Sequence, residues 1–287
     1  MQLATLKLGT FERAAILASH GYVPLERLRR SIGEPWPGTM MDLLTTGLWE
    51  ELRTWSRTED GIRSIAETPA VSREEAVFAP PYRNPEKIWG IGLNYVKQGA
   101  NPEREGPLDE PVGFMKPATT LIGPGDDIML PEDCGEVTAE AELAIVIGKR
   151  CRHVSEAEAP SVVAGFTTAL DMTAADIHGR NPRYLTRAKS YDTFFSFGPH
   201  LVSVDEIDDV LDLNVVTVLN GQEMFRNRIF NMKYRPWYTV AFHSRFMTLM
   251  PGDILLTGTP GPVAIRVGDR VECRVNDFRS LINPVAG

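Results

Sequence analysis

The segment Glu140-Ala141-Glu142 constrains this chain most, because it leads directly into the apolar run Leu-Ala-Ile-Val-Ile-Gly at 143–148. The length and β-branched content of this run predict a strand. In a strand, residues i and i+2 point to the same face, so the two glutamates project together. The same face continues through Ala144 and Val146, which favours an inward orientation.

Two neighbouring buried carboxylates repel each other and must be neutralised or paired. A divalent cation with oxygen ligands would do this, whereas a solvated strand edge is the alternative for such a pair. Asp171 follows Ala169-Leu170 in a second apolar segment, where it would suit a third oxygen ligand. Asp176 is better explained as a helix N-cap or a turn residue.

Composition and charge limit the class of protein. The 287 residues are 43% hydrophobic and 24% charged, which is typical of a globular protein. The net charge of −8 and the lack of a long basic run disfavour nucleic acid as a partner. The three cysteines are widely spaced, the N-terminus has no apolar signal core, and no run of about eighteen apolar residues occurs. We therefore expect a soluble cytoplasmic protein that does not bind membranes.

The chain is predicted to have two parts, a small α+β N-terminal domain (1–80) and a mainly β domain (87–287). A proline-rich stretch predicts an extended linker at 81–86. In the first part we expect strands at 2–8 and 13–18 and helices at 24–31 and 40–55. In the second, short apolar runs between turn residues predict strands at 88–93, 141–147, 213–219, 253–257 and 270–275, and helices at 155–159 and 236–246. No Gly-x-Gly-x-x-Gly or P-loop motif occurs, which argues against a nucleotide cofactor.

Several other polar residues are candidates for chemistry, each with a structural alternative. Lys189 would steady an enolate or carboxylate in a pocket, although a lone lysine is normally a surface residue. The segment 255–261 would bind a carboxylate through backbone N–H groups, or be a simple turn. Arg228 belongs to a basic patch that either caps the surface or anchors a second substrate carboxylate. His178 is the better candidate for acid–base work, and His243 is predicted to pack within a helix.

Together, and in this order, these segments resemble the fumarylacetoacetate hydrolase family, in its acylpyruvase, oxaloacetate decarboxylase and 2-hydroxyhepta-2,4-diene-1,7-dioate isomerase-like branch. The likeness covers about residues 85 to 287. The motifs that carry it are Lys-Ile-Trp-Gly-Ile-Gly-Leu-Asn-Tyr (87–95), Gly-Phe-Met-Lys-Pro (113–117), Glu-Ala-Glu-Leu-Ala-Ile-Val-Ile-Gly (140–148), Leu-Asp-Met-Thr-Ala-Ala-Asp (170–176), Thr-Arg-Ala-Lys-Ser-Tyr-Asp (186–192), Pro-Gly-Asp-Ile-Leu-Leu-Thr-Gly-Thr-Pro (251–260) and Asn-Pro-Val (283–285).

The resemblance implies a mixed β-roll, a homodimer, and Mg²⁺ or Mn²⁺ bound by Glu140, Glu142 and Asp171. It implies that Lys189 contacts substrate oxygen and that Thr259 holds a substrate carboxylate. The metal would polarise a 2-oxo acid or 1,3-dicarbonyl substrate and stabilise the enolate formed when a C–C bond breaks or a proton leaves.

The sequence departs from the family pattern where hydrolytic members carry a water-activating His and Glu, which here read Gln98 and Asn101. Neither amide takes up a proton at neutral pH. We predict a metal-dependent enzyme that performs C–C hydrolysis or decarboxylation. An isomerase or tautomerase of the same substrates, or a non-catalytic oxo-acid binder, is the alternative. His178 would then be the proton carrier, and the predicted substrate contacts are Tyr95, Thr259, Gln98 and Arg228.

Overall fold

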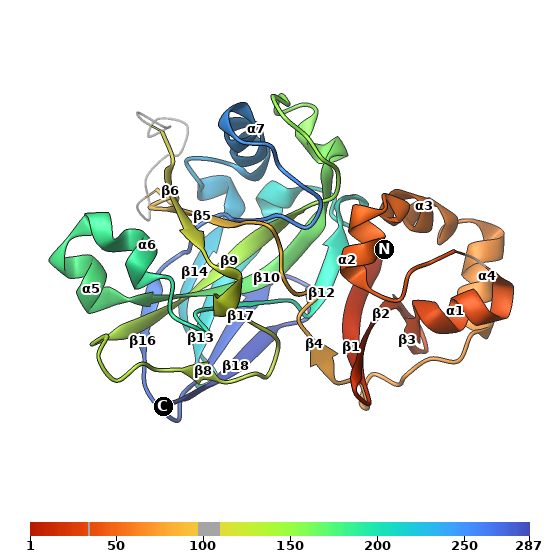
Figure 1. Ribbon diagram of the computed structural model, residues 1–287, viewed down its shortest axis with the longest axis horizontal. Coiled ribbons are helices and arrows are strands. Elements are labelled where there is room, and N and C mark those ends of the chain that lie inside the picture. Colours follow the sequence, from red (N-terminus) through yellow and green to blue (C-terminus); the bar gives the residue numbers. More distant parts are fainter. Residues whose placement is uncertain (34, 97–109) are drawn as a thin grey trace.

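The computed structural model of the protein describes residues 1–33, 35–96 and 110–287, which are mainly β (Figure 1). The strands are β1 Gln2–Leu8, β2 Phe11–Ala18, β3 Gly21–Pro24, β4 Phe78–Ala79, β5 Ile88–Gly92, β6 Val112–Lys116, β7 Leu121–Ile122, β8 Ile128–Met129, β9 Val137–Ile147, β10 Val163–Ala174, β11 Phe195–Phe197, β12 His200–Ser203, β13 Asn214–Leu219, β14 Gln222–Arg228, β15 Ile254–Leu256, β16 Pro262–Ile265, β17 Arg270–Val275 and β18 Leu281–Ala286. The helices are α1 Leu25–Ile32, α2 Met40–Thr45, α3 Leu48–Trp55, α4 Glu59–Glu67, α5 Ala175–Arg180, α6 Leu185–Ala188 and α7 Pro236–Phe246.

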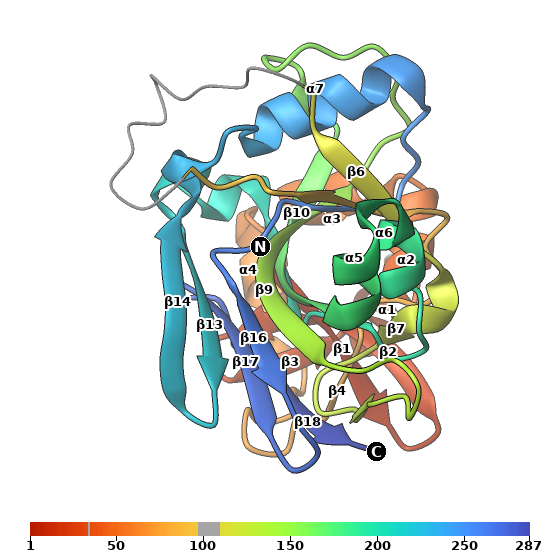
Figure 2. The same ribbon diagram turned by 90° about the vertical axis from the view of Figure 1, so that its left-hand side faces the viewer.

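The strands form two mixed sheets, which confirms the predicted mainly β class. The larger sheet follows the order β3-β2-β1-β12-β10-β9-β15-β5-β6, and the smaller one the order β14-β13-β17-β18-β8. Short strands β4, β7, β11 and β16 pair with the larger sheet outside this order. Figure 2 shows the long strand β9 curving beside α5 and α6, with the smaller sheet on its other side.

The pairing of β9 with β10 brings the acidic segments together. These two strands are antiparallel, and Asp171 lies directly opposite Glu140, while Glu142 lies opposite Ala169. All of β10 is buried, as is β9 from Ala141 onward, because their apolar side chains pack on both faces. The hydrophobic core that surrounds them therefore fixes the register on which the carboxylate cluster depends.

The N-terminal part shares its sheet and its core with the rest of the chain. Strand β1 pairs with β12 in an antiparallel ladder from Gln2 opposite Val202 to Ala4 opposite His200. One core cluster joins Leu3 and Trp49 to Val146 and Ile254. Helices α1–α4 gather beyond β1–β3 at one end of the molecule (Figure 1). The N-terminal strands therefore extend the larger sheet. The division into an N-terminal domain (1–80), a linker (81–86) and a second domain (87–287) stays a prediction.

The predicted helices need three corrections. The helix expected over 40–55 is divided into α2 and α3, because Gly47 between them adopts a left-handed backbone with φ of 79°. The charged stretch 59–67, for which no element was predicted, forms α4. The helix expected at 155–159 is instead a series of turns that ends in a short 3₁₀ segment, Ala159–Ser161. In contrast, α7 has the predicted bounds and buries His243 as a packing residue.

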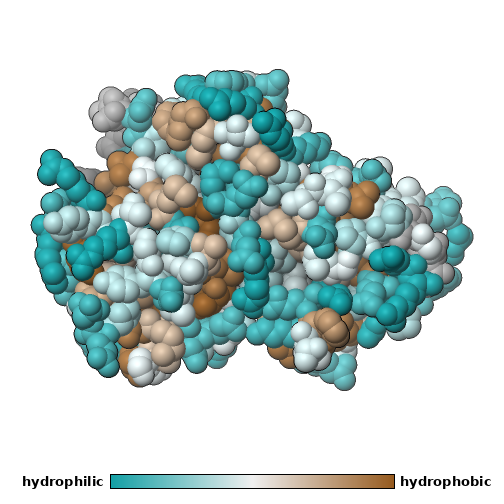
Figure 3. Space-filling view, in the orientation of Figure 1, coloured by the Kyte–Doolittle hydropathy of each residue, from teal (hydrophilic) through white to brown (hydrophobic). Residues whose placement is uncertain are grey.

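Within the described ranges, no helix is both long enough and apolar enough to cross a membrane. The face of the molecule in Figure 3 is mainly hydrophilic, with hydrophobic side chains in scattered patches. The cytoplasmic location stays a prediction.

A buried histidine makes the fold sensitive to acid. The His200 ring accepts from the Tyr22 hydroxyl at 2.9 Å through Nε2 and contacts Gln2 Oε1 at 3.2 Å through Nδ1. This pair of partners fits one neutral tautomer. Burial, together with the nearby guanidinium groups of Arg279 and Arg73, lowers the pKa of His200 to about 4.

We expect this histidine to cost the protein stability in acid. An unfolded chain protonates its histidine below a pH of about 6.5, whereas folded His200 stays neutral. Stability is therefore lost as the pH falls from about 6.5 to about 4, in total about 3 kcal/mol. Urea unfolding at pH 7 and pH 5 should show a smaller loss for His200→Gln than for the wild type. His20→Gln, at an exposed position, should keep the wild-type loss; an unchanged loss in His200→Gln would contradict the expectation.

Candidate active site

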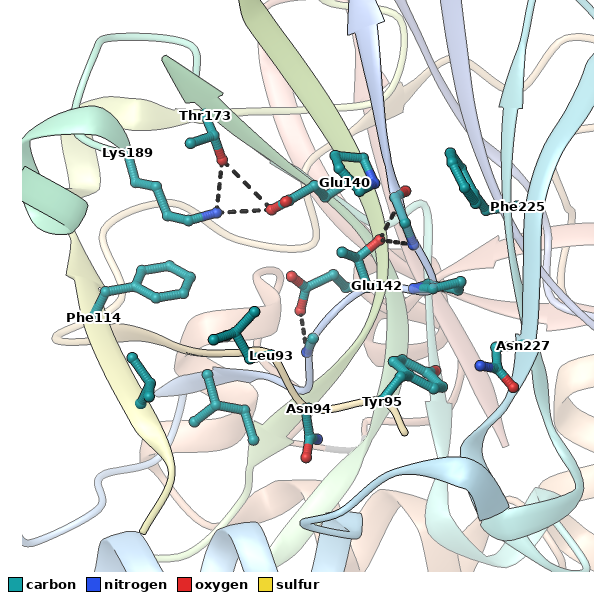
Figure 4. A pocket seen from close by; sticks show the side chains of 18 of the residues that line it. Leu93, Asn94, Tyr95, Phe114, Glu140, Glu142, Thr173, Lys189, Phe225 and Asn227 are labelled. Atoms are coloured by element: carbon teal, nitrogen blue, oxygen red, sulfur yellow. Dashed lines mark hydrogen bonds and ion pairs between the residues drawn. The ribbon is translucent and has the colours of Figure 1, made fainter. Parts of the chain in front are cut away.

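A cavity of about 810 Å³ opens where β9, β10 and the loops after β5 and β15 meet strand β14. Figure 4 shows Glu142 near its centre, Lys189 and Phe114 on one side, and Phe225 on the other. Of the residues predicted from the sequence, the structure places these in the lining: Tyr95, Glu140, Glu142, His178, Lys189 and Thr259. Asp171 is not part of the lining but lies within hydrogen-bond distance of Lys189.

The three predicted acidic residues form one cluster. One carboxylate oxygen from each of Glu140, Glu142 and Asp171 lies within 4.8 Å of the other two. Glu142 and Asp171 are 2% and 0% exposed. Burial, followed by repulsion from Asp171 and Glu140, raises the pKa of Glu142 well above its usual range. The fold thus holds a buried carboxylate whose charged form Lys189 and the Gly258 N–H compensate only in part.

Two lysines converge on Asp171. Lys189 Nζ donates to Asp171 Oδ2 at 2.5 Å, to Glu140 Oε2 at 2.8 Å and to Thr173 Oγ1 at 2.8 Å. Lys116 Nζ donates to Asp171 Oδ1 at 2.6 Å and to the Met172 carbonyl at 3.2 Å. Burial alone would raise the pKa of Asp171, but the two ammonium groups outweigh it and lower that pKa.

The two lysines differ in their own proton affinity. Burial lowers the pKa of Lys116 to about 8, despite its contact with Asp171. For Lys189, burial also opposes the charge, but Asp171 and Glu140 together raise the pKa above its usual range. Lys189 is therefore a permanent ammonium group at the edge of the cavity, whereas Lys116 is sealed in the core with a side chain that is 0% exposed.

The loop after β15 presents backbone donors to the cavity. The Gly258 N–H donates to Glu142 Oε2 at 2.6 Å, and Gly258 has a φ of 93°, which favours glycine. Buried Asn94 holds the neighbouring segments together, donating to the Thr257 and Tyr234 carbonyls at 2.6 and 2.9 Å and accepting from the Tyr234 N–H. Thr259 lies in the lining beside this rigid turn.

Tyr95 and His178, two further residues predicted from the sequence, line the cavity. The Tyr95 hydroxyl is buried with no hydrogen-bond partner among the described residues, and burial followed by Glu142 raises its pKa well above 10. A neutral phenol there is available to donate to a ligand. Half-buried His178 lines the same cavity from α5. Gln98 and Asn101 lie outside the described residues.

Arg228 is not brought to the cavity. Its guanidinium binds Asp212 and donates to the Leu211 carbonyl at 3.2 Å, and it is not part of the lining. The substrate-binding prediction for Arg228 therefore needs correction, because a nearby carboxylate holds the side chain elsewhere. Sequence reasoning also missed Lys116 and Thr173; the Gly-Phe-Met-Lys-Pro motif contained Lys116 but did not indicate its partner.

The donor set fits a hard divalent cation. Carboxylate oxygens are the ligands that Mg²⁺ and Mn²⁺ prefer, and the cluster supplies three of them at one place. Buried Glu142, with its raised pKa, is the group that such a cation would stabilise most.

Comparison with known proteins places this site in a family. The model for the fumarylacetoacetate (FAA) hydrolase C-terminal domain matches residues 87–286. The chain belongs to the fumarylacetoacetate hydrolase family. This confirms the resemblance inferred from its motifs. The mitochondrial oxaloacetate tautomerase FAHD2A of Bos taurus is 35% identical over 261 residues, which cover 87% of this chain and 80% of that protein.

Solved structures of family members resemble the whole chain. Maleylpyruvate hydrolase from Sphingobium sp. SYK-6, in complex with manganese(II) and pyruvate, is 27% identical, with a TM-score of 0.81 over 100% of this chain and 99% of that one. The 5-carboxymethyl-2-hydroxymuconate delta-isomerase from Mycobacterium smegmatis is 29% identical, with a TM-score of 0.77 over 100% and 98% of the two chains. The likeness to these two structures therefore extends over the N-terminal strands as well as the matched domain.

Proposed function

We propose that this family member catalyses keto–enol tautomerisation of a 2-oxo acid, with Mg²⁺ or Mn²⁺ held by Glu140, Glu142 and Asp171. The observation that carries the proposal is the meeting of this acidic cluster with Lys189 and His178 in one cavity. The 35% identity to an oxaloacetate tautomerase supports the reaction type. The manganese-bound hydrolase structure supports the metal. A homodimer remains part of the proposal as an expectation from the family.

The bound metal would supply a positive charge that polarises the 2-oxo group of the substrate. His178 takes the proton from C3, and the Lys189 ammonium stabilises the negative charge that develops on the C2 oxygen. His178 then returns the proton to that oxygen, which completes the enol without a net change in protons. Thr259 holds the substrate carboxylate. The Gly258 N–H keeps Glu142 in place throughout.

Tautomerisation is favoured over hydrolysis because the reaction needs no activated water. Gln98 and Asn101 stand where hydrolytic members of the family carry a His and a Glu, and neither amide serves as a base at neutral pH. Hydrolysis would instead require another base, and the relative named as a hydrolase keeps hydrolysis as the second candidate. Decarboxylation, like tautomerisation, needs a stabilised enolate but no activated water.

An activity panel separates these possibilities. Oxaloacetate, phenylpyruvate and acylpyruvates should be followed for enol formation, C–C cleavage and CO₂ release, with added Mg²⁺ or Mn²⁺ and after chelation. We expect enol formation that chelation abolishes and that His178→Asn reduces by about 100-fold. Activity unchanged by chelation and by Glu142→Ala would overturn the metal-assisted mechanism. Tight binding of oxalate and Mg²⁺ by calorimetry, with no turnover of any substrate, would support a non-catalytic binder.

A further inference from the structure

The cavity has a second half that the proposed reaction does not use. Beyond the acidic cluster it is lined by four unusually exposed apolar side chains, Leu93 (81%), Val112 (49%), Met224 (42%) and Phe225 (39%). They come from three separate segments, the loop after β5, the start of β6 and strand β14. Exposed apolar side chains that gather around one cavity mark a site for apolar ligand atoms.

Phe225 is the best-defined member of this wall. Its ring rests against the backbone of Gly261, where an added methyl group would meet the ring at 2.4 Å. Gly261 belongs to the loop after β15, so this contact holds the ring at the cavity wall. Figure 4 shows Phe225 across the cavity from Lys189, with Glu142 between them. A 2-oxo acid bound at the acidic cluster through its carboxylate and 2-oxo oxygen would leave its C3 substituent facing the apolar half of the cavity, to which this ring belongs.

The described lining of this half offers little to a second carboxylate. Among the described lining residues, the lysine and arginine are Lys189 and Arg226. Lys189 belongs to the acidic cluster. The Arg226 guanidinium donates to both carboxylate oxygens of Glu223, at 2.8 and 2.6 Å, so its charge is already balanced. A dicarboxylic oxo acid would have to displace Glu223 to gain a cation here, whereas an apolar substituent only needs the existing wall.

The size of the cavity agrees with a larger substrate. Its volume of about 810 Å³ lies in the upper part of the range, roughly 300–1,000 Å³, of pockets that enclose drug-sized ligands. We propose that the preferred substrate is a 2-oxo acid with an apolar, aryl-sized substituent at C3 rather than a second carboxylate, and that Phe225 determines this preference. The inference rests on the proposed function and narrows its substrate class.

The test compares phenylpyruvate with oxaloacetate on the metal-loaded full chain. We expect the wild type to have a kcat/KM for phenylpyruvate at least about tenfold higher than for oxaloacetate. Phe225→Ala should lower kcat/KM for phenylpyruvate by about tenfold and leave that for oxaloacetate within about threefold. Phe11→Ala removes an aromatic ring that is 59% exposed and lies outside the lining, so it should change neither.

An equilibrium measurement keeps this inference separate from the proposed function. Calorimetric titration should give tighter binding of phenylpyruvate than of 2-oxoglutarate, a stable dicarboxylic oxo acid, and Phe225→Ala should remove the difference. If phenylpyruvate binds more tightly in this way but no substrate is turned over, the proposed tautomerase function is overturned, whereas the proposed substrate class still holds. Conversely, the substrate class would be overturned if oxaloacetate is preferred, if Arg226→Gln weakens the dicarboxylate selectively, or if Phe225→Ala affects both substrates equally.

Discussion

Replacement of Lys189 by methionine is expected to lower kcat/KM for 2-oxo acid tautomerisation by about 100- to 1,000-fold. Methionine keeps the length and apolar stem of the side chain but removes the ammonium group that faces the cavity. That group stays charged at neutral pH, since Asp171 and Glu140 raise its pKa. The ammonium group therefore acts mainly in the step in which negative charge develops on the substrate oxygen. The loss should accordingly appear in kcat rather than in KM.

A matched control is available outside the site. Lys87 Nζ pairs with the fully buried carboxylate of Asp253 at 2.8 Å, as Lys189 does with Asp171, but it does not line the cavity. Lys87→Met should therefore cost stability while leaving kcat/KM within about threefold of the wild type. Manganese binding followed by electron paramagnetic resonance would show whether Lys189→Met still holds the metal. A variant that binds Mn²⁺ and retains more than about a tenth of wild-type kcat would contradict the role given to Lys189.

The acidic cluster was predictable because short-range rules govern it. Strand alternation places Glu140 and Glu142 on one face, and the apolar residues that follow show which face turns inward. The position of Asp171 at the polar end of an apolar segment indicated a third ligand, although only the register of β9 with β10 proves that it lies opposite Glu140. Family motifs then identified Lys189, which its local sequence could not separate from an ordinary surface lysine.

The features that the sequence did not reveal are contacts between residues far apart in the chain and contacts for which more than one partner is possible. Lys116 meets Asp171 from 55 positions away, and nothing in its own strand indicates that its ammonium group is buried. Likewise, the junction of β1 with β12 depends on a strand nearly 200 residues further along the chain. Arg228 had two plausible roles, capping the surface or anchoring a substrate carboxylate, and in the structure it pairs with Asp212. Single-sequence patterns do not rank such alternatives.

The largest effect on stability is expected from Asp171→Asn. The substitution keeps the shape of the side chain but removes the negative charge that faces Lys116 and Lys189, in a site where Lys116 and Asp171 are fully buried. The single amide oxygen of asparagine can accept from only one of the two lysines. Removing one partner of a buried ion pair typically costs about 3–5 kcal/mol, because the other charge stays buried without compensation. Urea unfolding at pH 7 in the presence of a chelator should show this loss. Asp60→Asn, which breaks the exposed pair with Arg63, should cost less than about 1 kcal/mol.

A double variant shows whether this loss of stability comes from the uncompensated charge of Lys116. If it does, Lys116→Met combined with Asp171→Leu should be more stable than Asp171→Leu alone, because well-packed apolar residues often replace a buried pair without net cost. Lys189 would still have Glu140 and Thr173 as partners. The double variant should nevertheless lose Mn²⁺ binding, since one of the three carboxylates is gone. A stable protein without a metal site would mean that the chain keeps the buried Lys116–Asp171 pair for its chemistry rather than for its stability. Equal instability of the two variants would instead place the cost in packing.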